Sequence, residues 1–468
     1  MSTLERLKLR RTEMWLLLLA TVVVAVMFVS LEVALGNELG LHIIMLIGGY
    51  IGVFTIAHLA MAWVAPFADQ IMLPVVALLN GIGLVMIYRL DLATGYTTVN
   101  SQLMWTLVGA VLMILVLVLL RDYKSLSRYS YLLGVIGLVL LALPLVWPQP
   151  AGVEARIWIW LGPFSIQPGE FSKILLLLFF AQLLATKRAL FTVAGYRFLG
   201  MDFPRLRDLA PILVVWAMAI LIMAGANDFG PALLLFSTVL AMVYLATGRG
   251  SWLLIGAVLV ATGAYAVYQV SGKIQERVQN FLDPVAHYDT TGYQLSQSLF
   301  GMSWGGITGT GIGQGYPNMI PVVHSDFILA AIGEELGLIG LAAIIVLFGV
   351  FVTRGLRTAT LARDSYGKLV ASGLSMTIMI QIFVVVAGIS ALMPMTGLTT
   401  PFMSQGGSSL MANYILLAII LRISDSARRP AMIKQLEKQG IDPEIVGNTG
   451  NPGNQGNPAY PGNPGVNA

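Results

Sequence analysis

Cysteine is absent from this 468-residue chain, and histidine occurs only four times. The lack of cysteine excludes disulfide bonds, thiolate metal sites and a cysteine nucleophile. Charged residues are also scarce, at 11% of the chain, against about 25% in ordinary soluble domains. Hydrophobic residues make up 57%. A soluble fold could not cover its surface with so few charges, so the sequence predicts an all-α polytopic membrane protein.

The hydrophobic residues fall into twelve runs, most of them long enough to cross about 30 Å of hydrocarbon as helices. The first run follows a basic segment and is too long for a cleaved signal peptide, so we expect a retained anchor. The expected spans are residues 14–35, 41–64, 70–88, 102–120, 130–147, 170–186, 208–224, 228–246, 251–270, 326–353, 368–392 and 407–424.

The distribution of basic residues predicts the orientation of these spans. If the N-terminus is cytoplasmic, the inner segments hold 22 of the 27 Lys and Arg residues. The positive-inside rule therefore places both termini in the cytoplasm. It also explains the net charge of +4 as a topology signal, and no nucleic-acid partner is expected. The outer side keeps Arg89, Arg156, Lys173, Lys273 and Arg277.

Acidic and basic side chains within or at the ends of membrane spans cost free energy, so each is expected to have a structural partner or a functional role. Glu170 and Lys173 are three residues apart and share a helix face. They form either a structural ion pair or a wall that holds a charged head group. Asp228 precedes Phe229-Gly230-Pro231 and is expected to cap the next helix, where its carboxylate would accept backbone N–H bonds.

Asp326 is the last polar residue of the long outer loop 271–325. It is either the N-cap of the following span or a carboxylate placed where a lipid-linked polar substrate would present its reactive group. Glu334 and Glu335 lie two turns deeper and point to different faces, so we expect at least one to be paired within the bundle.

Other polar features favour structural roles. His58 lies in the middle of a span and is expected to be packed and hydrogen-bonded. His287 and His324 have no second histidine at a metal-binding spacing. The stretch 305–315 (GGITGTGIGQG) gives no true G-x-G-x-x-G or Walker A motif and is expected to be a flexible outer loop.

Four strings in order resemble one family. They are IQPGEFSK (166–173), GYQLSQSLF (292–300), PVVHSDFILAAIGEELGLIG (321–340) and PMTGLTTPFMSQGGSSLMANY (394–414). They are similar to the SEDS family of bacterial cell-wall synthesis (RodA, FtsW and SpoVE), with the greatest likeness to its actinobacterial RodA branch. Two departures are Gly169, where the family commonly has Ser, and Ala226-Asn227-Asp228-Phe229-Gly230-Pro231, where it commonly has Gln-Pro-Asp-Leu-Gly-Thr. The second weakens a substrate role for Asp228.

The resemblance implies a ten-helix core, so twelve spans correspond to that core plus an N-terminal pair without an assigned role. We expect a basic cytoplasmic N-terminus (1–13), the extra helix pair (14–66), the glycosyltransferase core (67–430) with its large extracellular loop, and a cytoplasmic tail (431–468). The tail is rich in Gly, Asn and Pro and is expected to be disordered.

The resemblance also implies a peptidoglycan glycosyltransferase that polymerises lipid II on the outer leaflet of the bacterial plasma membrane during elongation. The essential acidic residue of the family falls on Asp326, which is expected to act as a general base. Arg277, Lys173 and Arg156, or a divalent cation (Mg²⁺ or Mn²⁺), would offset the diphosphate charge. The sequence contains no cluster of metal-ligating residues that would require a metal ion. Glu170, Gln297 and Ser408 lie in the matching strings and are taken as substrate-binding candidates; Asp228, Glu334 and Glu335 are left as structural or uncertain.

Three alternatives stay open. A lipid II flippase would use the same buried charges, although it needs polar residues that reach the midplane. A division-type (FtsW) polymerase shares all four strings. A non-catalytic scaffold would tolerate loss of the Asp326 charge. The resemblance further implies a class B penicillin-binding protein as the partner that cross-links the new strand.

Overall fold

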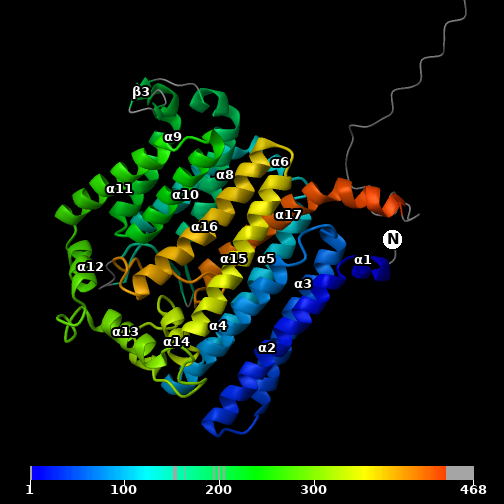
Figure 1. Cartoon of the computed structure of the whole chain (residues 1–468), viewed down its shortest axis with the longest axis vertical. Helices are drawn as coiled ribbons and strands as arrows, with labels where there is room; N and C mark the ends of the chain where they lie inside the picture. Colours follow the sequence, from blue (N-terminus) through cyan, green and yellow to red (C-terminus); the bar gives the residue numbers. More distant parts are fainter. Residues whose placement is uncertain are drawn as a thin grey trace, which may run out of the picture.

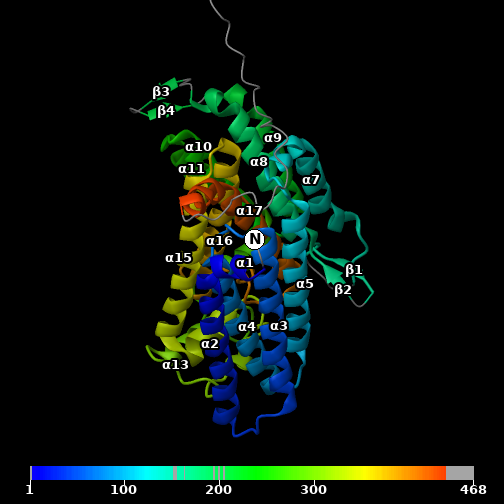
Figure 2. The same cartoon turned by 90° about the vertical axis from the view of Figure 1, so that its right-hand side faces the viewer.

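The computed structural model describes residues 3–150, 155–162, 164–192, 196–198, 201–203 and 206–438. The described chain forms a helical bundle (Figure 1) with two small antiparallel hairpins (Figure 2). The helices, all α except the 3₁₀ turn η1, are α1 (Thr3–Leu9), α2 (Arg11–Leu35), α3 (Leu41–Val64), α4 (Met72–Thr94), α5 (Thr98–Leu119), α6 (Lys124–Arg128), α7 (Ser130–Val146), α8 (Pro168–Thr192), α9 (Leu206–Gly225), α10 (Phe229–Thr247), α11 (Ser251–Val270), α12 (Gly272–Leu282), α13 (Tyr293–Gly305), η1 (Pro317–Met319), α14 (Ile328–Glu335), α15 (Gly337–Leu361), α16 (Ser365–Ile389) and α17 (Gly407–Lys438). The strands are β1 (Ile159–Leu161), β2 (Phe164–Ile166), β3 (Tyr196–Phe198) and β4 (Met201–Phe203).

Ten of the described helices are long and apolar enough to cross a membrane: α2, α3, α4, α5, α8, α10, α11, α15, α16 and α17. Two shorter apolar helices, α7 and the Val214–Gly225 part of α9, coincide with the remaining predicted spans. The prediction of a multi-pass helical membrane protein is therefore confirmed. One predicted span, 326–353, is wrong as a single helix, because the chain breaks at Leu336 and Gly337 into the short α14 and the long α15.

The two long connections, 148–169 and 271–325, contain more structure than the sequence predicted. The large loop 271–325 holds α12, α13 and η1. The loop 148–169 contains the β1–β2 hairpin, in which Ile159 pairs with Ile166. This hairpin stands beside α5 and α7 (Figure 2), and Phe164 meets the ring of Trp105 edge-on at 6.4 Å.

Helices α4 and α17 lie at the centre of the bundle and are almost completely buried. Glycines let the loop before α17 come close to α4 and α5. A Cβ at Gly83 would lie 2.5 Å from the Met403 carbonyl oxygen, and one at Gly407 would lie 2.6 Å from the Trp105 ring. Phe402 of this loop is buried, with its ring 5.9 Å from that of Tyr414. Residues 400–404 of the loop 390–406 are thus buried inside the bundle.

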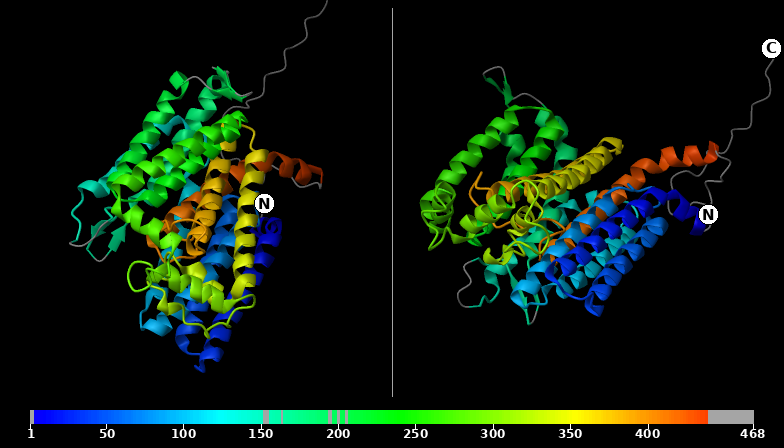
Figure 3. Two further views of the ribbon diagram at one scale, coloured as in Figure 1. Left: turned by 60° about the vertical axis from the view of Figure 1, so that its left-hand side comes forward. Right: turned by 60° about the horizontal axis from the view of Figure 1, so that its bottom comes forward.

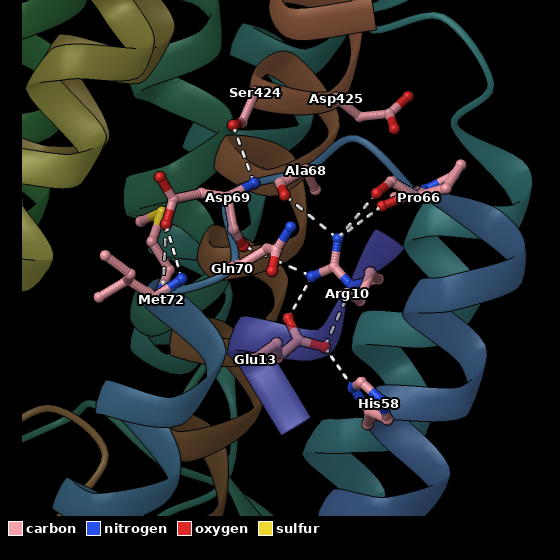
Figure 4. Close-up of polar contacts among 12 residues, drawn as sticks. Arg10, Glu13, His58, Pro66, Ala68, Asp69, Gln70, Met72, Ser424 and Asp425 are labelled. Carbon is pink, nitrogen blue, oxygen red and sulfur yellow. Dashed lines mark hydrogen bonds and ion pairs between the residues drawn. The ribbon is translucent and has the colours of Figure 1, made fainter. Parts of the chain in front are cut away.

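The N-terminal helix pair lies along one flank, with α2 against α4 and α3 against α5 (Figure 3). A buried polar cluster attaches one end of the pair to the chain that enters α4 (Figure 4). Arg10 donates to the carbonyl oxygens of Ala65 (3.0 Å) and Ala68 (3.1 Å) and is paired with Glu13. His58 bonds Glu13 through Nδ1 at 2.7 Å, as expected for a packed histidine.

The same linker is tied to the far end of the chain through Asp69. Its carboxylate accepts from Arg354 of α15 at 2.8 Å and from Arg428 of α17, and its backbone N–H donates to Ser424 at 3.1 Å. Helix α17 continues to Lys438, so the prediction of a disordered tail from residue 431 is wrong for 431–438, which are helical. Residues 439–468 lie outside the described residues.

Candidate active site

Asp326 lies at the turn that leads into α14, and it does not cap that helix. The N-cap residue is Phe327, and the Asp326 carboxylate accepts a hydrogen bond from the Ser325 hydroxyl at 3.0 Å. Burial raises the pKa of Asp326 above its ordinary value, and Ser325, Arg277 and His324 oppose the rise. The N-cap interpretation is therefore wrong, and the carboxylate remains available as a base.

The backbone on the N-terminal side of Asp326 is fixed by the loop 390–406. The Gln405 N–H donates to the His324 carbonyl oxygen at 2.8 Å, and the Ser404 hydroxyl donates to the Ser325 carbonyl oxygen. Ser404 also accepts from the Thr400 N–H at 2.9 Å. The carboxylate is therefore presented by a turn whose carbonyl groups at His324 and Ser325 both accept hydrogen bonds.

Arg277 reaches the same place from α12. Its Nη1 donates to the Thr396 carbonyl oxygen at 3.2 Å. Burial lowers the pKa of Arg277. The negative charges of Asp326 and Asp228 oppose the change, so the guanidinium interacts electrostatically with both carboxylates. The structure thus brings together two candidates, Arg277 and Asp326, that are far apart in the sequence.

Gly397 separates these two side chains and was missed by the sequence reasoning. It has φ +74°, and a Cβ there would lie 3.5 Å from Arg277 Nη2 and 3.6 Å from Asp326 Oδ2. A side chain at this position would occupy the space between the cation and the carboxylate. Gly397 belongs to the last of the four strings, next to Thr396. Its place in that string did not indicate that it lies beside Arg277 and Asp326.

Asp228 is the second carboxylate of the region. It occupies the N-cap position of α10 as predicted, but its side chain makes no capping hydrogen bond, so the predicted bonds from backbone N–H groups to its carboxylate are wrong. Burial raises its pKa to about 7; Glu170 adds to the rise, and Lys273 and Arg277 oppose it. Asp228 lines a small cavity together with Arg156 and Gln167.

Glu170 and Lys173 form the expected ion pair, with Lys173 Nζ 2.6 Å from Glu170 Oε2. Both side chains are largely buried. Helix α8 begins at Pro168, a favoured residue for the first turn, rather than after it. Lys173 lines a second cavity that shares Leu141, Gly169 and Met223 with the Asp228 cavity.

Ser408 and Gln297 have different surroundings. Ser408, at the start of α17, accepts from the Gln167 N–H at 2.9 Å and so joins two of the matching strings next to Glu170. Gln297 of α13 donates to the Tyr288 hydroxyl at 2.8 Å, which holds the preceding loop onto its own helix. The structure therefore brings Ser408 toward the Glu170 region and gives Gln297 a bond within the segment 271–325.

An apolar groove lies beside the start of α8. Its lining residues come from α7, the β1–β2 hairpin, α8 and α17, and all are apolar: Leu140, Ile159, Leu161, Ile166, Pro168, Phe171, Ile174, Leu175 and Ile415. Its volume is about 450 Å³. A surface of this kind suits a hydrocarbon chain rather than a polar ligand.

Glu334 and Glu335, at the end of α14, are buried and bonded. Glu335 pairs with Arg89 of α4 at 2.8 Å and accepts from the Gly313 N–H at 3.0 Å. Glu334 accepts from the Tyr316 N–H at 2.6 Å. The predicted pairing within the bundle is confirmed for Glu335, and Arg89 is committed to this structural contact.

The glycine-rich stretch is not a flexible loop. The N–H groups of Thr310 and Gly311 donate to the carbonyl oxygens of Glu334 and Glu335, both at 3.0 Å. In return, Leu338 donates to the Gly306 carbonyl oxygen at 3.0 Å. A Cβ at Gly309 would lie 2.2 Å from the Glu335 oxygen, so the close approach requires glycine.

This loop satisfies the backbone groups exposed by the helix break. The last carbonyl groups of α14 and the first N–H groups of α15 have no partners within their helices. Unpaired backbone groups are costly away from water, and residues 306–313 supply the partners. The break at Leu336–Gly337 and the glycine-rich loop therefore form one structural unit.

The charged groups around Asp326 include a cation and no cluster of carboxylates among the described residues. Among the described residues, no group of three or more His, Asp or Glu could hold a metal ion. The other charged side chain beside Gly397 is the guanidinium of Arg277, not a second carboxylate. The alternative of Mg²⁺ or Mn²⁺ stays a prediction, and the chemistry of these residues is derived without it.

Comparison with known proteins defines the class. The model of the FtsW/RodA/SpoVE family of cell cycle proteins matches residues 69–429. The chain belongs to this family and is a multi-pass membrane protein. A solved structure described as the structural coordination of polymerization and crosslinking by a peptidoglycan synthase complex is similar with a TM-score of 0.59. The identity is 25%, over 77% of this chain and 98% of that chain.

Curated relatives distinguish the branches of the family. The peptidoglycan glycosyltransferase RodA of Mycobacterium tuberculosis H37Rv is 52% identical over 400 residues, covering 84% of this chain and 85% of the relative. The stage V sporulation protein E of Bacillus subtilis is 31% identical over 371 residues, covering 77% of this chain and 98% of the relative. The probable FtsW of the same bacterium is 32% identical over 377 residues, covering 76% of this chain and 90% of the relative. The chain is thus more similar to this RodA than to these two relatives.

Proposed function

We propose that this protein is a peptidoglycan glycosyltransferase that polymerises lipid II at the outer face of the bacterial plasma membrane. The observation that carries the proposal is that Asp326 and Arg277 both lie beside Gly397, in a chain 52% identical to a protein named peptidoglycan glycosyltransferase RodA. The higher identity to RodA than to the FtsW and SpoVE relatives favours a role in elongation and cell shape.

The chemistry of the substrate defines what the site must do. Lipid II carries its sugar through an α-linked diphosphate and the polymer is β-1,4 linked, so the anomeric carbon inverts in a single displacement. The acceptor 4-hydroxyl oxygen bonds to that carbon as the bond to the diphosphate oxygen breaks. The hydroxyl proton passes to the Asp326 carboxylate. The negative charge that develops on undecaprenyl diphosphate needs fixed positive charge.

Arg277 is the cation best placed to supply that charge. Its Nη1 is held by the Thr396 carbonyl oxygen, and its Nη2 faces Gly397 beside Asp326. Lys173 is paired with Glu170, and Arg156 is exposed beside the Asp228 cavity. These two cations are therefore better suited to contact the polar head group of the substrate than to offset the charge that develops in the reaction. The apolar groove beside α8 offers a surface for the prenyl chain.

We further propose a class B penicillin-binding protein as the partner and an outward-facing site with both termini cytoplasmic. The relevant structural relative is described as a peptidoglycan synthase complex that coordinates polymerization and crosslinking. The basic residues favour this orientation.

The test uses the purified protein with its candidate partner, supplied with lipid II, and follows glycan strands on a gel. We expect strands from the wild type and a loss of at least about 10²-fold in Asp326→Asn, because general-base help is worth roughly 10² to 10⁴ in rate. Equal strands from both would exclude Asp326 as the base. No strands from either, with lipid II still crossing vesicles, would support a flippase.

A further inference from the structure

The outer end of the N-terminal helix pair contacts the glycine-rich loop. Gln314 Nε2 donates to the Ala34 carbonyl oxygen of α2 at 3.1 Å. Gly313 is buried against the same helix, and a Cβ there would lie 3.1 Å from Leu31 and 3.4 Å from Leu35. Two features of the sequence without an assigned role, the extra helix pair and the glycine-rich loop, therefore form one interface.

Helix α4 strengthens this interface through two consecutive residues. The Tyr88 hydroxyl donates to Glu32 of α2 at 2.5 Å, and both side chains are buried. The next residue, Arg89, pairs with Glu335 and donates to the Gly315 carbonyl oxygen at 2.8 Å. The outer end of α4 thus holds α2 through one side chain and the loop with α14 through the other.

Helix α14 connects this interface to Asp326. It is a fully buried helix of 8 residues, so it spans about 12 Å at 1.5 Å per residue. Glu334 and Glu335 end the helix, and Asp326 lies two residues before it starts. Because a hydrogen-bonded helix is stiff, a displacement of its C-terminal end is transmitted to the turn that carries the carboxylate.

We propose that α2 is a positioning element for the catalytic segment: through Glu32, Tyr88 and the glycine-rich loop it fixes α14 and thereby the Asp326 carboxylate. Glu32 touches neither substrate nor reacting atoms and acts through the loop. The inference rests on the proposed function in one respect: it takes Asp326 to be the catalytic base. The mechanical link from α2 to α14 is a separate statement that can be measured without substrate.

The experiment compares two buried carboxylates at opposite ends of α2. Glu32→Leu removes the bond to Tyr88 at the loop end, and Glu13→Leu removes the bonds to Arg10 and His58 at the other end. Glu32→Gln keeps an oxygen that can accept from Tyr88. The readouts for the full-length protein in lipid nanodiscs are kcat and KM with lipid II, the thermal midpoint, and hydrogen exchange of residues 306–336.

We expect Glu32→Leu to lower kcat by about tenfold with KM unchanged, since a misplacement of 1 Å can cost ~10²-fold. Hydrogen exchange in 306–336 should be faster in Glu32→Leu, and Glu32→Gln should restore both properties. Glu13→Leu should lower the thermal midpoint at least as much, because it leaves the buried Arg10 without its acidic partner, yet keep kcat. Equal losses of kcat in both Leu variants would overturn the proposal in favour of simple packing.

A covalent link provides a second test if Glu32→Leu folds poorly. Because the chain has no cysteine, Ala34→Cys and Gln314→Cys can be joined selectively by a short thiol cross-linker that reductant cleaves. The link should restore kcat and slow exchange in the Glu32→Leu background, and reductant should reverse both. No effect of the link on either readout would contradict the proposal. Slowed exchange without any polymerisation in the wild type would instead contradict the proposed function.

Discussion

Arg277 and Asp326 face the same glycine from two different elements. The guanidinium comes from α12 and the carboxylate from the turn before α14, and Gly397 lies between them without a side chain to fill the space. A carboxylate and a cation therefore lie near the same point, as the proposed inverting displacement of a diphosphate requires.

Replacing Arg277 tests the role of this cation. We expect Arg277→Ala to lower kcat by roughly 10² to 10³-fold, the range seen when one charge-stabilising donor is removed. Arg277→Lys should recover part of the loss, because it keeps the charge but not the fixed planar geometry. The measurement is single-turnover polymerisation with lipid II. Normal kcat in Arg277→Ala would assign charge compensation to another group.

The pH dependence of the reaction reports on Asp326. Only the ionised carboxylate can accept a proton, so kcat/KM should rise with pH and level off above the Asp326 pKa. Burial raises this pKa above the ordinary value, so the inflection should lie above about 4. Arg277→Gln should move it higher still, because the cation opposes the rise. An inflection that disappears in Asp228→Asn would belong to that residue instead.

Asp228 gives a prediction about stability. Its pKa is about 7 in the folded protein and about 3.9 in an unfolded chain. Between these values the folded state retains a proton that the unfolded state has lost, so the free energy of unfolding falls as pH rises through this window. Thermal midpoints in detergent from about pH 4 to 7 should fall less steeply in Asp228→Asn. Parallel curves would contradict the assigned pKa.

The glycine-rich loop can be tested with two matched glycines. Gly309 and Gly306 both have positive φ, but a Cβ at Gly309 would lie 2.2 Å from a backbone oxygen, whereas one at Gly306 would meet nothing within 4 Å. Gly306 has φ +53° and ψ −136°, so Gly306→Ala should cost only the backbone strain, of about 1–3 kcal/mol. Gly309→Ala should lower the thermal midpoint further and reduce polymerisation. Similar thermal midpoints for the two variants would show that the loop can move to accommodate a Cβ at Gly309 without loss of stability.

Some of the fold and the site could be read from local patterns. Hydrophobic runs located twelve apolar helices, and the spacing of Glu170 and Lys173 predicted their ion pair. The break at Leu336–Gly337 was missed because the glutamates before it, Glu334 and Glu335, were interpreted as residues paired inside one continuous span. Periodicity could not show that Arg277 meets Thr396, since that contact depends on how distant segments pack.

The interlocked helix break has a consequence for how the protein enters the membrane. The chain ends of α14 and α15 need the N–H and carbonyl groups of residues 306–311, which are synthesised first. If α14 entered hydrocarbon alone, it would carry unpaired peptide groups at its end. We therefore expect residues 293–361 to insert together, with the loop remaining at the surface until α15 has emerged from the ribosome.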